Sequence, residues 1–435
     1  MKRPTLWRCA VAAALLAGAV ASSAYQGPLA ESFTPLHVLW QRAGEGRVLP
    51  ALVEAERMHA LGRIGPSELA QLLAIAGDES GAERLMAQAY PQKVVDMPPP
   101  PRAVMERAVD AIAALARTRR VVILNESHAD SRQRAFALAL AARLRGLGYT
   151  HFGAETFTDG VAGSMRDGAP DAATGVYTAD PVFADLVRYA QRIGYVLFPY
   201  EQREDQALHA PADSGPSARE WAQARNIVDL LVADPDARVF IFSGGSHLRE
   251  TVDARGREWM GAWLRRLGGL DPLTVDQNAG LPHPAPARET PLYRSLRPLL
   301  PNYVAAVRLN GGDYATRDGV DMVVFHPALA SVTARPAWLY MCGYRLPYVI
   351  ALPAGDQRRL VRAVAADEPA GSTAVDQVLV AAGTAKVELM LPTGRYLIQS
   401  QSEQGHDTVL MTRLDTVTRP VSDGLAGYQR AMSCW

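Results

Sequence analysis

Short apolar segments that end in polar residues recur along the chain and constrain its fold more than any other feature. The first covers Val121–Leu124, and an amphipathic stretch at 132–147 with apolar residues at helical spacing follows it. Similar apolar runs follow at 151–154, 195–198 and 239–242. Strands this apolar, separated by helices, are typical of a parallel sheet covered on both faces. We therefore predict an α/β fold with a mostly parallel sheet over residues 103–345.

Two further regions flank the predicted sheet domain. Residues 25–96 carry Leu, Ala and Met at three- and four-residue spacings, which predicts a small helical region that packs or docks on a protein partner. A stiff proline-rich linker at 97–102 follows it. Residues 346–435 contain short strands, and Pro392–Gly394 has the composition of a hairpin turn. We expect a small antiparallel β domain there.

The first 24 residues have the layout of a secretory signal. Basic residues precede an apolar run at 9–21, and small residues come before Tyr25. The run is too short to span a bilayer, so we expect a periplasmic or secreted protein with no membrane span after cleavage. An oxidising compartment would allow Cys342 and Cys434 to pair, although they are equally compatible with two unrelated thiols.

Charge and motif content exclude several classes of function. The chain has 45 basic and 45 acidic residues, which argues against a nucleic-acid-binding protein. Its three cysteines exclude a multi-cysteine metal site. The nucleophile elbow, the HExxH motif and the glycine-rich phosphate loops are absent. A small molecule or a peptide is therefore the expected substrate.

Polar residues follow each of the four predicted strands at its carboxyl end. They are Asn125, Glu126 and His128, then Glu155, then Tyr200 and Glu201, and finally Gly244, Gly245 and His247. Ligands of open parallel sheets bind at this edge, so we expect these residues to form one site. Each group alone would be compatible with solvated loop residues.

The spacing of these residues indicates their chemistry. Glu126 and His128 are two apart, so on an extended segment they share a face where the carboxylate can orient the imidazole. Gly244 and Gly245 let the backbone approach a ligand, and His247 is expected to begin a helix. In a helix over 217–232, Arg219, Gln223 and Asn226 share one face, from which Arg219 could bind an anion or a carbonyl oxygen. The same row of polar residues is also typical of a solvent-exposed helix face.

These motifs resemble those of the erythromycin esterase and ChaN-like superfamily. The similar segments are Leu124–His128 with Arg132, Gly148-Tyr149 with Glu155, Arg219-Glu220 with Asn226, Gly244–His247, and Met260-Gly261 with Leu264, all within 119–278. Asn125 stands where the family usually has glycine. The shorter Glu-x-His spacing is closer to ChaN-like proteins than to the esterases, which argues against macrolide esters as substrates.

The leading hypothesis is an exported hydrolase that activates water against an ester or an amide. His128 is the general base, Glu126 orients it and Glu155 shares or relays a proton, while His247 and Arg219 stabilise the oxyanion. The residues expected to support them or contact substrate are Asn125, Tyr200, Glu201, Gly244, Gly245 and Asn226.

Two alternatives remain open at this point. The resemblance also implies a haem- or metal-ion-binding protein without turnover, in which His128, His247, Glu126 and Glu155 hold a divalent metal, or Tyr200 or a histidine ligates haem iron. The other alternative is a degenerate site, with the flanking domains acting through protein contacts.

Overall fold

The computed structural model describes residues 34–89, 97–100, 102–165, 168–211, 215, 217–328 and 335–416. The predicted signal sequence and Cys434 lie outside these residues, so secretion and the Cys342–Cys434 disulfide stay predictions. In the described parts of the chain, every helix is too short or too polar to cross a lipid bilayer.

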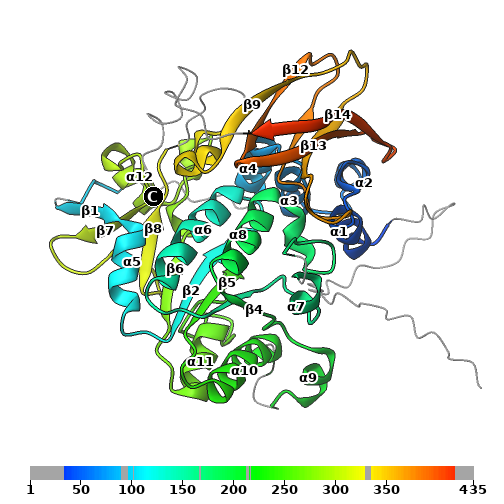
Figure 1. Ribbon diagram of the computed structural model, residues 1–435. Helices are drawn as coiled ribbons and strands as arrows, with labels where there is room; N and C mark the ends of the chain where they lie inside the picture. Colours follow the sequence, from blue (N-terminus) through cyan, green and yellow to red (C-terminus); the bar gives the residue numbers. More distant parts are fainter. Residues whose placement is uncertain are drawn as a thin grey trace, which may run out of the picture.

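An eight-stranded, mostly parallel sheet forms the centre of the molecule, which confirms the predicted α/β fold (Figure 1). Its strands, in spatial order, are β1 (Ala103–Arg107), β7 (Ala305–Leu309), β8 (Met322–Phe325), β6 (Leu273–Asp276), β2 (Val121–Glu126), β5 (Val239–Gly244), β3 (His151–Ala154) and β4 (Val196–Phe198). From β8 to β4 all neighbours are parallel, while β7 is antiparallel to both β8 and β1. The carboxyl ends of β2, β5, β3 and β4 therefore share one edge.

Helices cover both faces of this sheet. One face carries α5 (Ala108–Ala116), α6 (Ser131–Arg145) and α8 (Pro181–Arg192). The other carries α10 (Ala218–Ala233), α11 (Met260–Gly268) and α12 (Pro291–Leu296). Two short helices, α7 (Val161–Ser164) and α9 (Glu204–His209), belong to the connections.

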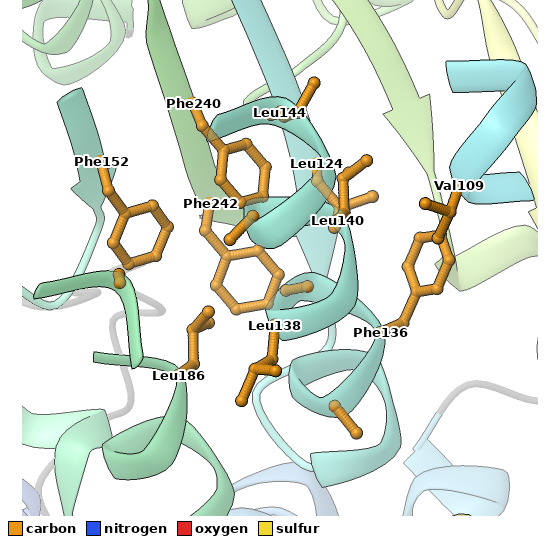
Figure 2. Packing of buried hydrophobic residues seen from close by; sticks show 14 of the residues in the cluster. Val109, Leu124, Phe136, Leu138, Leu140, Leu144, Phe152, Leu186, Phe240 and Phe242 are labelled. Carbon is orange, nitrogen blue, oxygen red and sulfur yellow. The ribbon is translucent and has the colours of Figure 1, made fainter. Parts of the chain in front are cut away.

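Alternation along the strands divides the core between these two helical layers. In β5, Phe240 and Phe242 pack against the side of α6 and α8, whereas Val239 and Ile241 pack against α10 and α11. Figure 2 shows Phe242 next to Leu138 of α6, with Phe240 on the same side of the strand. Because both faces are buried, strands β2, β3 and β5 are apolar at nearly every position up to their carboxyl ends.

The flanking regions are helical before the sheet and antiparallel β after it, as predicted. The helices are α1 (Leu36–Gly44), α2 (Val48–Ala60), α3 (Pro66–Ile75) and α4 (Glu79–Ala89). The strands are β9 (Leu346–Ala351), β10 (Arg359–Ala365), β11 (Asp376–Val380), β12 (Lys386–Leu391), β13 (Gly394–Gln401) and β14 (Asp407–Thr416). The expected hairpin at Pro392–Gly394 is wrong, because β12 pairs with β9 while β13 pairs with β10 and β14.

The helical region and the β domain pack against each other, and Figure 1 shows them side by side above the sheet. Gln401 of β13 accepts a hydrogen bond from Leu49 N at 3.0 Å and donates one to Gly46 O at 2.9 Å. Leu360 of β10 lies within the apolar core of the helical region. The helices therefore bury part of their apolar surface inside this chain.

Candidate active site

The four strand ends converge on one cluster of ionisable side chains. Glu126, at the last position of β2, contacts His128, and Glu155, just after β3, lies beside both His128 and His247. Glu201, beyond β4, joins the cluster through Arg219 of α10. These residues therefore lie close together, as expected from the sequence, whereas their roles remain proposals.

A buried carboxylate fixes the ring of His128. Glu126 Oε1 lies 2.7 Å from His128 Nδ1, while its Oε2 accepts a 2.7 Å hydrogen bond from Arg134 Nε of α6. Burial acts to raise the pKa of Glu126, but the charges of Arg134 and His128 outweigh it and hold that pKa below its ordinary value. An ionised carboxylate only accepts, so Nδ1 carries the proton and Nε2 of a neutral His128 is left with its lone pair.

The backbone at His128 is in the left-handed region. Its φ is 55°, and Ala129 N donates to Ser127 O at 2.6 Å, which closes a three-residue turn. Such a conformation costs a non-glycine residue about 1–3 kcal/mol and persists only where its surroundings impose it. Asp130 ends the turn by accepting a hydrogen bond from Arg132 N at the start of α6. The turn directs the imidazole back towards Glu126 and Glu155.

Glu155 is anchored from two sides. Its Oε2 accepts a 2.5 Å hydrogen bond from Gly244 N and lies 3.8 Å from His128 Nε2, and its Oε1 accepts from Arg219 Nη2 at 2.7 Å. Burial acts to raise the pKa of Glu155, but His247, Arg219 and His128 hold it well below the ordinary value. As an ionised carboxylate, Glu155 thus holds Gly244 N and Arg219 in place, and its role as a proton relay stays a prediction.

Arg219 extends from α10 over the edge of the sheet. Its Nε donates to Glu201 Oε1 at 3.0 Å, and its Nη2 donates to Glu201 at 2.6 Å as well as to Glu155. Gln223 holds the same Glu201 carboxylate at 3.0 Å. Arg219 is 27% exposed, and its Nη1, which lies 3.4 Å from His247 Nε2, has no carboxylate partner among the described residues. This nitrogen can donate to an anion or a carbonyl oxygen.

His247 lies between two carboxylates. Its Nδ1 is 2.7 Å from Glu220 Oε2, and its Nε2 is 3.4 Å from Glu155 Oε1. Burial acts to lower its pKa, but Glu220 and Glu155 raise it to about 10, so His247 is an imidazolium at neutral pH. The expectation that His247 begins a helix is wrong: it lies in a turn after β5, and α11 begins only at Met260.

The remaining predicted residues support the site without facing the cluster. Asn125 points to the opposite face of β2 from Glu126 and donates to Asp276 Oδ1 at 2.7 Å. Tyr200 is fully buried and donates to Phe242 O at 3.1 Å. Asn226 holds the chain after β4 through the carbonyls of Tyr200 and Glu201. Gly245 has a φ of 47°, which glycine adopts without strain in the turn that brings His247 back.

The donor atoms present do not fit a divalent metal or a haem iron. Both oxygens of Glu126 and of Glu155 already accept hydrogen bonds, and the Arg219 guanidinium lies among the carboxylates. Within the described residues, no three His, Cys, Asp or Glu side chains are grouped as metal ligands. Tyr200, beyond the end of β4, is fully buried, and its hydroxyl donates to Phe242 O, so it is not free to ligate a haem iron.

Sequence reasoning missed three residues that complete the cluster. Arg134 lies in the first turn of α6, eight residues after Glu126, and reaches back over the strand end to bind that carboxylate. Glu220 was part of the Arg219-Glu220 motif but received no role. Tyr177, in the short 3₁₀ helix η2 (Val176–Ala179), stacks on His128 with 4.1 Å between ring centroids and 17° between planes. Nothing in its local sequence indicates this contact.

Comparisons with known proteins give few matches. No family model and no curated protein sequence matches the chain. Among solved structures, the type III effector HopBA1 is 13% identical over 44% of this chain and 91% of its own, with a TM-score of 0.29. The C-terminal region of Pasteurella multocida toxin, described as having a thiol-protease like catalytic triad, is 11% identical over 84% of this chain and 55% of its own, with a TM-score of 0.27. Neither similarity bears on function.

Proposed function

We propose that this protein is a hydrolase that activates water against an ester or an amide. The observation that carries the proposal is the orientation of His128. Glu126 holds Nδ1 at 2.7 Å, so the basic Nε2 faces Glu155, with the cations Arg219 and His247 on the far side of that carboxylate. An oriented base opposite fixed positive charge is the arrangement that acyl-group hydrolysis requires.

In the first step, His128 Nε2 removes a proton from water while the water oxygen bonds to the carbonyl carbon. The 3.8 Å separation of His128 Nε2 and Glu155 Oε2 allows one water to lie about 2.8 Å from both atoms. Glu126 stabilises the imidazolium that forms and keeps its orientation. The carbonyl π electrons move to the oxygen, which becomes the oxyanion.

Arg219 stabilises that oxyanion. Its Nη1, beside His247 Nε2 at 3.4 Å, has no carboxylate partner in the described part of the chain and is positioned to donate, because Nε and Nη2 are held in place by Glu201 and Glu155. His247 has both ring nitrogens directed at carboxylates, so it contributes charge and anchors Glu155. In the second step the carbon–oxygen or carbon–nitrogen bond breaks, and the leaving group takes the proton from His128 Nε2. The products are an acid and an alcohol or an amine.

This proposal agrees with the resemblance to the erythromycin esterase and ChaN-like superfamily, which we propose as the family of the chain. The metal- or haem-binding alternative gains no support, since the oxygens it needs already accept hydrogen bonds from Arg134, His128, Arg219 and Gly244.

The test is a screen of purified protein against p-nitrophenyl esters and amides of increasing acyl length, with and without EDTA. We expect an ester to be hydrolysed at the same rate in both conditions. His128→Ala should lower kcat by about a hundredfold or more, because it removes the base. His406→Ala, at an exposed turn between β13 and β14, is the matched control and should retain full activity. A folded His128→Ala variant with the wild-type rate would refute the assignment.

A further inference from the structure

The loop that carries His128 is enclosed by residues from the N-terminal helical region as well as by the sheet. Ala129, the next residue, is 2% exposed and belongs to the apolar core of that region. Arg132, at the start of α6, pairs with Glu83 of α4 at 3.3 Å. The strained turn at His128 therefore has the sheet on one side and helices α1–α4 on the other.

Tyr177 forms the wall against which the His128 ring rests. The two rings are nearly parallel at 4.1 Å, and Tyr177 is only 9% exposed. Its backbone is fixed because Tyr177 N donates to Thr156 Oγ1 at 2.8 Å, one residue beyond Glu155. Glu126 restrains the ring of His128 at Nδ1, and Tyr177 restrains its plane. Two different contacts thus define where Nε2 points.

Trp40 of α1 supports Tyr177 from the other side. Its ring meets that of Tyr177 edge-on, with 6.2 Å between centroids and 76° between planes, and Trp40 is 8% exposed. A continuous line of contacts leads from α1 through Tyr177 to His128. Edge-to-face and stacked aromatic pairs resist displacement more than aliphatic contacts of the same area, because their geometry is specific.

We propose that Tyr177, backed by Trp40, is a positioning residue that holds the His128 imidazole in register with Glu155, so that the helical region is a working part of the catalytic centre. The proposal rests on the proposed function, in which His128 is the base. It also gives the helical region a role inside the chain. A displacement of the base by about 1 Å is enough to lower a rate by up to about a hundredfold.

The experiment compares three variants of the full-length mature protein. Tyr177→Phe keeps the stacked ring, Tyr177→Leu removes it, and Trp40→Leu removes its support. Leu61→Ala, an exposed apolar residue of the same helical region, is the control. Ester hydrolysis gives kcat and KM. The ¹H shift of the His128 ring, assigned by its loss in His128→Gln, reports stacking independently of turnover, because a proton above an aromatic face resonates upfield.

We expect Tyr177→Phe to retain kcat within about threefold, and Tyr177→Leu to lose about tenfold or more in kcat at nearly constant KM. The kcat of Trp40→Leu should lie between the kcat values of the two Tyr177 variants. In Tyr177→Leu, the His128 ring signal should move downfield. Equal losses of kcat in Tyr177→Phe and Tyr177→Leu would overturn the proposal, since they would show that the hydroxyl group, and not the stacked ring, supports turnover. Unchanged kcat in a Tyr177→Leu variant whose His128 signal has moved would overturn it too.

Failure of the proposed function gives a different result. If the wild-type protein hydrolyses no ester or amide, that function fails, while the ring shift still tests the geometry. A His128 signal that is the same in Tyr177→Leu and in the wild type would refute the stacking, whatever the enzyme does.

Discussion

The Cα of Gly244 lies so close to His128 that a Cβ there would be 2.3 Å from His128 Nε2, and also 2.8 Å from Glu155 Oε2. No real Cβ tolerates such distances, so one of the two side chains would have to move. The carboxyl end of β5 thus approaches the proposed base as closely as a backbone without a side chain allows. Glycine at this position is a requirement of the site geometry rather than of the strand.

Gly244→Ala should therefore abolish the proposed hydrolysis without unfolding the protein. We expect kcat to fall by about a hundredfold, because the methyl group displaces the imidazole from Glu155. Gly163→Ala is the matched control, since a Cβ there meets no atom within 4 Å. Ester hydrolysis and thermal unfolding of both variants check this. A fully active Gly244→Ala enzyme would show that His128 Nε2 does not act from this position.

Glu126→Gln should also lower activity strongly. The amide keeps the shape of the side chain but can present its NH₂ group to His128 Nδ1, which favours the tautomer with Nε2 protonated. We expect kcat to fall about a hundredfold or more with little change in KM. Glu56→Gln, which perturbs a distant pair with Arg358, is the control and should be as active as the wild type. A kcat of Glu126→Gln equal to that of the wild type would mean that the carboxylate does not orient the base.

His326 should make the protein less stable in mild acid. It is fully buried in the fold, and desolvation lowers its pKa to about 3, against about 6.5 in the unfolded chain. Between these values the unfolded state binds a proton that the folded state does not. The free energy of unfolding therefore falls as the pH drops from about 6.5 towards 3, by up to about 1.4 kcal/mol per pH unit.

Urea unfolding at pH 7, 5 and 4 measures this contribution by comparing the wild type with His326→Gln. The variant lacks the titrating imidazole, and its amide can still donate to Gln277, which His326 Nε2 now contacts at 3.0 Å. We expect its stability to decrease less steeply with acid than that of the wild type. Parallel pH profiles would contradict the prediction.

Arg345 should be essential for the attachment of the β domain to α8. It is fully buried, its Nη2 donates to Asp185 at 2.5 Å, and its Nη1 reaches Met390 O at 3.4 Å. Arg345→Met leaves the buried Asp185 carboxylate with only the longer, 3.5 Å ion pair to Arg188, so we expect a loss of about 3–5 kcal/mol in the free energy of unfolding. Arg413→Met removes a surface pair with Asp415 and should cost less than about 1 kcal/mol. Denaturant titration of both variants distinguishes the two cases.

The parallel sheet and the convergence of its strand ends could be predicted because both depend on local signals. Apolar runs identify strands, and parallel strands necessarily bring their carboxyl ends to one edge. The Glu126–His128 contact was expected from a two-residue spacing on an extended segment, but a left-handed turn at His128 makes it instead. These features require no knowledge of which distant segments pack together.

The features that the sequence did not predict depend on tertiary packing. Tyr177 reaches His128 only because η2 docks over the end of β2, and Pro392–Gly394 has a hairpin composition although its flanking strands pair elsewhere. Whether Glu155 relays protons or anchors other groups depends on Gly244 N and Arg219, which approach from β5 and α10. Which side chains and strands contact one another in these cases cannot be predicted from the sequence of a single segment.

The contact between Gln401 and the turn at Gly46 has a consequence for the order of events during synthesis. The helices that back Tyr177 precede the sheet in the chain, whereas strand β13, which fastens them, follows it. We therefore expect a nascent chain to assemble its sheet and its charged cluster well before the base acquires its final orientation. The orientation of the proposed base would then depend on a strand that is synthesised after every strand of the central sheet.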